Sequence, residues 1–326
     1  MDRFIKLPSA NAIGADNTAV IDCPTDRRYH TIFITATNDA AANFSSLVDA
    51  IRLKINGNIQ RNYNFEDGDM FITSLPGNIE RGLNSYVFDL DTNGSGDTGL
   101  SPVRPLGAGL VNSVIANDND DTMLSKNTFA VQFRNPFYMT PQGMNALSWG
   151  MRDVSTFQIE IDLASSLGSN FQLTGRAIVD NVNEPLGAII KLKRYTVPIT
   201  ATGDYYLSTL PKQDAYKRIH LLSDTINEVE LTVDQAIMFY QTKAENNFWK
   251  QFNGLLLPYN VASYNDNPFN ILFDVNRLAS DALPMVKQDG NRVSDFQIRV
   301  NMNTATSFTA YTETLGFADG LSPVAG

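Results

Sequence analysis

Hydrophobic and polar residues alternate in several short stretches of the chain. From Ile51 to Ile55, aliphatic residues alternate with arginine and lysine, the period of a strand with one buried face and one solvent face. Asn56-Gly57 follows and suits the positive φ angles of a tight hairpin turn, after which Ile59 resumes the apolar series. The pattern predicts a β-hairpin with Leu53 on its buried face.

The chain carries this unit twice. Tyr29 and Ile32 in the first copy correspond to Tyr216 and Ile219, and both pairs have the same separation along the chain. The separation is shorter at Leu53/Leu231 and shorter again at Ile159/Ile298, so the first copy holds longer connections between its strands. A β-unit that recurs over the whole chain predicts two similar β-domains in tandem. Several short strands in each copy fit an all-β fold, a double jelly roll of two tandem jelly-roll β-barrels.

The repeat sets the expected domains. We predict an N-terminal jelly roll at residues 1–185 with a long insert around 66–126, and a C-terminal jelly roll at 190–326. The insert is dense in Gly, Pro, Asn and Asp, so we expect a surface excursion on the outer end of the first barrel. Aromatic residues at helical spacing predict a helix from Thr242 to Phe252, and we expect one or two short helices in all.

Charge and composition exclude several classes of protein. The net charge of −10 argues against a broad surface for nucleic-acid phosphates, so we expect no sequence-specific binding of nucleic acid. The single cysteine, Cys23, excludes an internal disulfide framework and is compatible with folding in the cytoplasm. The first residues lack the apolar core of a signal peptide, and no apolar run has the length of a membrane span.

The residues that usually carry catalysis are sparse. His30 and His220 are the only histidines, they occupy different positions in the two copies, and a metal site of the cupin type needs a cluster. No motif marks Cys23 as an activated nucleophile, and no spacing singles out a carboxylate pair. We therefore predict no enzymatic activity and no certain cofactor.

One stretch has the spacing of a calcium loop. Asp89, Asp91, Asn93 and Asp97 place oxygen ligands at alternate positions around Gly94. The twelfth position, which would supply a bidentate glutamate, is Leu100. The four oxygen ligands form a candidate calcium site, and a solvated glycine-rich turn is the alternative.

A basic cluster begins the second copy. Lys191, Lys193 and Arg194, echoed by Arg3 and Lys6, are candidates to face an anionic lipid surface. The alternative is that these charges protect the first strand of each barrel from edge pairing. Fewer than four basic residues give weak membrane attraction, which favours the second interpretation.

Three stretches together resemble one family. They are the strand Arg28-Tyr-His-Thr-Ile-Phe-Ile34, the hairpin Ile51-Arg-Leu-Lys-Ile-Asn-Gly57, and the restart Leu210-Pro followed by Tyr216-Lys-Arg-Ile-His220. This series is similar to the double jelly-roll major capsid proteins of tailless icosahedral bacteriophages with an internal membrane, of the corticovirus and finnlakevirus type.

The resemblance implies a structural protein of the virion capsid, made in the host cytoplasm. In that family three subunits form a pseudo-hexagonal trimer, and trimers tile an icosahedral shell beside penton and minor capsid proteins and above an internal membrane. The internal repeat agrees, because six similar barrels around a threefold axis present nearly sixfold edges. The alternative is a carbohydrate- or receptor-binding β-sandwich of a spike or an adhesin.

Overall fold

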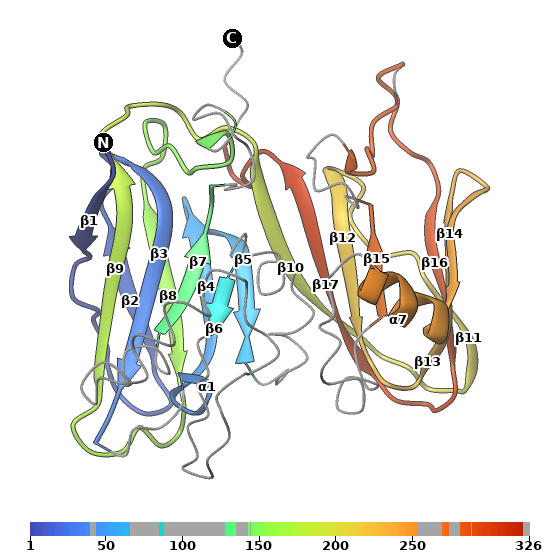
Figure 1. The fold of residues 1–326 in the computed structure, drawn as a ribbon, viewed down its shortest axis with the longest axis horizontal. Helices are drawn as coiled ribbons and strands as arrows, with labels where there is room; N and C mark the ends of the chain where they lie inside the picture. Colours follow the sequence, from blue (N-terminus) through green and yellow to red (C-terminus); the bar gives the residue numbers. More distant parts are fainter. Residues whose placement is uncertain are drawn as a thin grey trace. The chain divides into compact units, whose positions relative to one another are not determined.

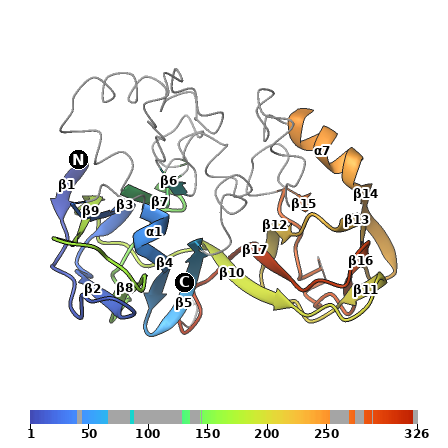
Figure 2. The same cartoon turned by 90° about the horizontal axis from the view of Figure 1, so that it is seen from below.

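The computed structural model describes residues 1–39, 44–65, 85–87, 128–134, 143, 145–252, 269–273, 281–287 and 289–321. The chain divides into two compact units, residues 1–189 with 317–326 and residues 190–316. Each unit is built from two layers of antiparallel strands, visible in Figures 1 and 2.

The first unit holds the strands β1 to β9 and a one-turn helix, α1. Its two layers have the orders β1-β9-β3-β7-β6 and β5-β4-β8-β2. The bounds are β1 Arg3–Lys6, β2 Thr18–Cys23, β3 Arg28–Thr37, α1 Phe44–Leu47, β4 Val48–Ile55, β5 Asn58–Asn64, β6 Ser85–Val87, β7 Thr128–Gln132, β8 Phe157–Leu163 and β9 Gln172–Asp180.

The second unit repeats the same arrangement with β10 to β17. Its layers have the orders β10-β17-β12-β15 and β14-β13-β16-β11. The bounds are β10 Ile189–Val197, β11 Gly203–Leu207, β12 Ala215–Leu222, β13 Ile226–Val233, β14 Ala236–Thr242, α7 Lys243–Phe252, β15 Phe269–Leu272, β16 Phe296–Met302 and β17 Phe308–Gly316. Apart from β6, each strand of the first unit has one counterpart in the same place and order. Both units therefore have the jelly-roll topology, and the predicted all-β double jelly roll is confirmed.

The predicted pairs of strands are confirmed residue by residue. Leu53 lies opposite Ile159 in the β4–β8 pair, and Leu231 lies opposite Ile298 in the β13–β16 pair. All four side chains are buried, as the alternation predicts, and they face the core of their own unit. A shift by one residue would have turned each strand's apolar face to water, so the register is fixed by this burial.

The end of the chain groups with the first unit rather than with the predicted C-terminal domain 190–326. Residues 317–326 follow β17, yet the Gln60 side chain on β5 donates to the backbone oxygen of Asp319 at 3.1 Å and accepts from its nitrogen at 3.0 Å. Gln60 is fully buried under this contact. The sequence pattern cannot reveal such an attachment because it depends on one side-chain amide.

The predicted helix is confirmed with its start one residue later than expected. Thr242 is the N-cap, because its hydroxyl accepts from the Glu245 nitrogen at 3.4 Å and Glu245 accepts in return from the Thr242 nitrogen at 2.8 Å. This reciprocal pair is a capping box, which satisfies two of the donors that a helix start leaves unpaired. The Thr-x-x-Glu sequence thus ends β14 and starts α7.

Candidate functional site

The same tyrosine hydrogen bond closes one corner of each jelly roll. The Tyr29 hydroxyl donates to the Pro24 backbone oxygen at 2.7 Å, and the Tyr216 hydroxyl donates to the Pro211 oxygen at 2.7 Å. Both rings are fully buried, so each phenol needs this acceptor. The two corners are therefore closed by the same bond, once in each copy of the repeat.

The hairpin turns are also matched. Asn56 accepts through Oδ1 from the backbone nitrogens of 155–156 at 2.9 and 3.0 Å. Asp234 accepts through Oδ1 from those of 294–295, both at 2.9 Å. Both turn residues have positive φ, 48° and 45°, which an Asn or Asp tolerates better than most residues. Equivalent turns and corners give two barrels of nearly equal construction.

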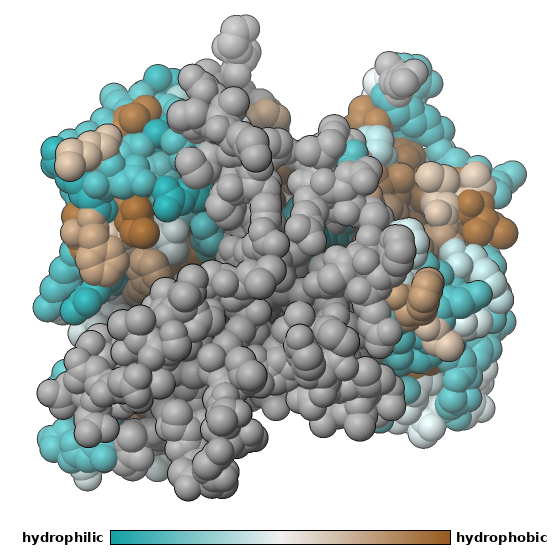
Figure 3. Space-filling view, in the orientation of Figure 1, coloured by the Kyte–Doolittle hydropathy of each residue, from teal (hydrophilic) through white to brown (hydrophobic). Residues whose placement is uncertain are grey.

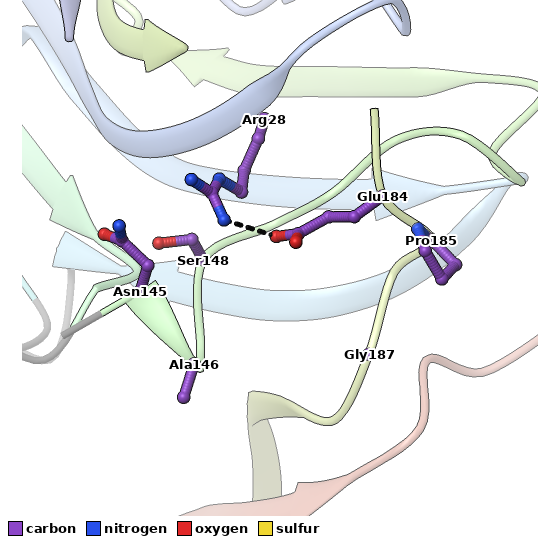
Figure 4. A pocket seen from close by; sticks show the side chains of 7 residues that line it. All are labelled: Arg28, Asn145, Ala146, Ser148, Glu184, Pro185 and Gly187. Carbon is purple, nitrogen blue, oxygen red and sulfur yellow. Dashed lines mark hydrogen bonds and ion pairs between the residues drawn. The ribbon is translucent and has the colours of Figure 1, made fainter. Parts of the chain in front are cut away.

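A pocket of the first unit lies beside Arg28 at the start of β3. It has a volume of about 480 Å³, and Figure 4 shows the Arg28 and Glu184 side chains meeting across it. Its lining consists of Arg28, Asn145, Ala146, Ser148, Glu184, Pro185 and Gly187. The Arg28 guanidinium donates to Glu184 at 2.7 Å and to the buried Asp180 at 2.5 Å. The pocket wall thus contains an ion-pair network in which Arg28 is shared between two carboxylates.

His30 lies beneath this network and is fully buried. Its Nδ1 lies 2.9 Å from the Ser148 hydroxyl and its Nε2 lies 3.0 Å from Asp180. Burial lowers the pKa of His30 even though Asp180 favours its charged form. Burial alone would raise the pKa of Asp180, but bonds from Arg28, the Val182 nitrogen and His30 hold that pKa below its usual range. The histidine is a structural hydrogen-bonding residue.

Asp2, His30 and Asp180 bring three potential metal ligands within 4.8 Å of one another. Arg134 donates to Asp2 at 2.8 Å, and Arg28 donates to Asp180. Two guanidinium groups therefore already neutralise both carboxylates, and a divalent cation would have to displace them. The cluster fits an ionic clasp of the N-terminus better than a metal centre.

The second unit buries a different polar cluster around Glu313 on β17. His220 lies 3.4 Å from this carboxylate and Lys217 lies 3.8 Å from it. Burial opposes ionisation of Glu313, but His220, Lys217 and Arg218 hold its pKa at about 2. At mildly acidic pH the same carboxylate would begin to take up a proton in the unfolded chain, whereas in the folded protein Glu313 stays ionised.

This cluster predicts a pH dependence of stability. A depressed folded-state pKa contributes stability that is complete above the ordinary pKa of 4.5 and is lost as the pH falls toward about 2. Between pH 4.5 and 2 we expect the free energy of unfolding, measured in urea, to fall less for Glu313→Gln than for the unchanged protein. If the free energy of unfolding fell equally with pH in both proteins, this role of Glu313 would be contradicted.

A single amide anchors α7 to the sheet. Asn246, fully buried, donates to the Asn270 backbone oxygen at 2.7 Å and accepts from its nitrogen at 3.0 Å. The side chain thus pairs with β15 in the way that a neighbouring strand would.

We expect Asn246→Ala to destabilise the second unit by about 1–3 kcal/mol, because it leaves two buried backbone groups unpaired. Asn247→Ala is the matched control, since the Oδ1 of Asn247 has no hydrogen-bond partner in the described part of the chain. Urea unfolding of both variants measures the difference, and equal stability would contradict the anchoring role.

The outer faces of the two units carry one ion pair with its charges exchanged. Arg52 lies opposite Glu160 in the β4–β8 pair, with 3.3 Å between Nε and Oε2. At the equivalent positions Glu230 lies opposite Arg299, with 3.1 Å between the charged atoms. Such partly exposed pairs add little stability, but they make the otherwise similar faces electrostatically distinct.

The comparisons with known proteins agree with this architecture. Residues 189–317 match the family model of the viral coat protein P2 C-terminal domain, and these limits lie within one residue of the second unit. The second jelly roll is thus similar to a viral coat protein domain. No curated protein sequence matches the chain.

Solved structures show a likeness of fold over the whole chain. The major capsid protein P2 of bacteriophage PM2 matches with a TM-score of 0.71 and 14% identity, over 98% of this chain and 99% of that one. A chain in the atomic structure of Sulfolobus Turreted Icosahedral Virus matches with a TM-score of 0.58 and 10% identity, over 97% and 91%. A chain of the PBCV-1 virus capsid matches with a TM-score of 0.53 and 9% identity, over 97% of this chain and 93% of that one. At these identities the likeness establishes the fold.

The structure removes one residue from the candidate lipid-facing cluster. Lys191 is buried on β10 and forms an ion pair with Asp214, so it does not face a lipid surface. Cys23 ends β2 as a buried residue, which agrees with a small apolar role at a strand end. None of the helices in the described ranges combines the length and apolar character that crossing a membrane requires.

The candidate calcium site lies outside the described residues. Asp89, Asp91, Asn93 and Asp97 all belong to that part, as does the insert at 66–126 apart from β6. The sequence interpretation missed the Arg28 network, because Arg28 and Asp180 are far apart along the chain and meet only through the β3–β9 pair. It also missed the exchanged charges, which the repeat itself would have revealed on aligning Arg52 with Glu230.

Proposed function

We infer that the chain is a viral major capsid protein that acts by self-assembly in the capsid of a virion. The observation that carries this conclusion is the match of residues 189–317 to the viral coat protein P2 C-terminal domain, in a chain whose two units share one jelly-roll topology. A coat protein of this kind is a structural protein, and we propose that it has no enzymatic activity.

We propose that three copies form a pseudo-hexagonal homotrimer and that trimers tile an icosahedral shell. Two similar barrels in each chain give six around a threefold axis, which supports hexagonal lattice positions. The division into an N-terminal jelly roll at 1–185 and a C-terminal one from 190 is part of this proposal and is supported by the matched strand orders. Penton and minor capsid proteins, and an internal membrane, are the proposed further partners. Calcium binding at Asp89, Asp91, Asn93 and Asp97 stays a prediction.

Light scattering coupled to size-exclusion chromatography tests the trimer. We expect the purified protein to elute with three times the 36.0 kDa chain mass, with a shift toward larger assemblies as concentration rises. A chain that stays monomeric at all concentrations would contradict the capsid role and would favour a lone binding module such as a spike or an adhesin domain.

A further inference from the structure

The pocket beside Arg28 has an excess of negative charge on its wall. Arg28 supplies the positive charge of the lining, and its guanidinium is shared between the carboxylates of Glu184 and Asp180. His30, which lies beneath them, adds no charge at neutral pH, because burial lowers the pKa of its ring. One guanidinium therefore serves two carboxylates, and one negative charge of this network has no counter-charge.

Three other arginines close to this network have carboxylate partners of their own. The pairs are Arg27–Asp26 at 2.6 Å, Arg134–Asp2 at 2.8 Å and Arg152–Asp153 at 3.6 Å. Each pair is neutral as a whole, so none of them offsets the excess charge of the pocket wall.

Glu184 is the accessible carboxylate of the network, and its backbone is fixed. The side chain is 37% exposed, and Figure 4 shows it reaching across the pocket toward Arg28. Its Oε1 accepts from Arg28, and within the described residues Oε2 has no hydrogen-bond partner. The Arg152 nitrogen donates to the Glu184 backbone oxygen at 3.1 Å, and a Cβ on Gly150 would lie only 2.5 Å from that oxygen. The free carboxylate oxygen is thus held in place at the pocket.

Ser148 supplies a second acceptor. The Nε2 of His30 lies 3.0 Å from Asp180, and an ionised carboxylate only accepts, so Nε2 carries the ring proton. In the neutral ring Nδ1 is then an acceptor, and it takes the Ser148 hydroxyl proton across 2.9 Å. The hydroxyl proton is committed to the histidine, so the Ser148 oxygen can only accept from a ligand in the pocket.

The size and surroundings of the pocket suit a charged organic group. Its volume of about 480 Å³ lies within the range of about 300–1,000 Å³ that is usual for small-molecule sites. Hydrophilic residues dominate the end of the first unit where β9 ends and β3 begins, at the upper left of Figure 3. An apolar ligand would find few partners there.

We propose that this pocket binds an alkyl guanidinium or ammonium group, carried by an arginine or lysine side chain of another protein chain or by a free polyamine. The cation pairs with the free oxygen of Glu184 and donates to the oxygen of Ser148. A guanidinium fits better than an ammonium, because its planar set of N–H donors reaches two acceptors at once. A carboxylate ligand is disfavoured, since Glu184 and Asp180 already occupy Arg28. This site is additional to the capsid function and does not depend on it.

Ligand-observed nuclear magnetic resonance with the intact protein tests the site. The probe is Nα-acetyl-arginine methylamide, and its citrulline analogue, which has the same length and no charge, is the matched control. We expect the arginine probe to bind at least about tenfold more tightly than the citrulline analogue. Added salt should weaken its binding. Agmatine, a guanidinium without peptide groups, separates the two sources. Equal affinity supports a free polyamine, and weaker affinity supports a side chain of a protein.

Two variants locate the binding in this pocket. Glu184→Gln should weaken binding of the arginine probe at least about tenfold, because it replaces a charged acceptor with a neutral one. Asp204→Asn is the matched control, since Asp204 is 41% exposed and pairs with Arg299 in the second unit. Ala146→Phe fills the pocket, leaves every charge in place and should abolish binding. Circular dichroism verifies that each variant is folded.

Three results would overturn the proposal. The first is equal binding of the arginine and citrulline probes, and the second is unchanged binding to folded Glu184→Gln. The third is tighter binding of Nα-acetyl-glutamate methylamide, which would show that Arg28 rather than Glu184 selects the ligand. All three leave the capsid function in place, because the measurement of the trimer tests that function separately.

Discussion

Leu231→Asp should abolish folding of the second unit, with a loss of more than about 4 kcal/mol in the free energy of unfolding. Leu231 is fully buried on β13, inside a cluster of apolar side chains that includes Val229 and Ile298. An aspartate there would be a buried charge without a partner. Leu53→Asp should have the same effect on the first unit, because it occupies the equivalent place opposite Ile159.

Thr232→Asp is the matched control, because Thr232 is half-buried on the opposite face of the same strand. We expect it to cost less than about 1 kcal/mol. Urea unfolding followed by circular dichroism compares the variants. If Leu231→Asp unfolded like the unchanged protein, the assignment of faces in this hairpin would be wrong by one residue.

Arg28→Met should destabilise the first unit by about 3–5 kcal/mol, because it leaves the buried Asp180 carboxylate without its strongest partner. Arg28 donates to Asp180 and Glu184 together, and both Arg28 and Asp180 are nearly inaccessible to solvent. The pKa of Asp180 lies below its usual range in the folded protein, so its stabilising effect is present above the ordinary pKa of 3.8 and fades as the pH falls further. The difference between variant and unchanged protein should therefore narrow in acid.

Arg27→Met controls for the loss of an arginine. Arg27 pairs with the exposed Asp26 at 2.6 Å, a contact that should contribute less than about 1 kcal/mol. Thermal unfolding at neutral pH and at pH 3 separates the two cases. If Arg27→Met and Arg28→Met lost equal stability, the Arg28 network would contribute no more to stability than a surface ion pair.

Local alternation carried most of the fold prediction. The hairpin around Asn56 and its copy at Asp234 were predictable because side chains on a strand point alternately to two faces, and a turn residue with positive φ is recognisable in sequence. The equivalence of Leu53 and Leu231 followed from the same pattern. The repeat was therefore visible without any knowledge of how the strands pair.

Features that depend on pairing were not predictable. The Arg28–Asp180 bond requires β3 beside β9, and the Gln60–Asp319 contact requires the end of the chain to return to β5. Lys191 resembled a surface charge in the sequence, but its strand position places it in the interior beside Asp214. In each case the side chain's environment is set by residues far along the chain.

Electron microscopy of the purified protein tests the central claim, that this chain is a capsid subunit with two equivalent barrels. We expect averaged particles to show six densities of similar size around a threefold axis, which assemble into sheets or shells at high concentration. Particles that contain only two barrel-sized densities and never associate further would contradict the account.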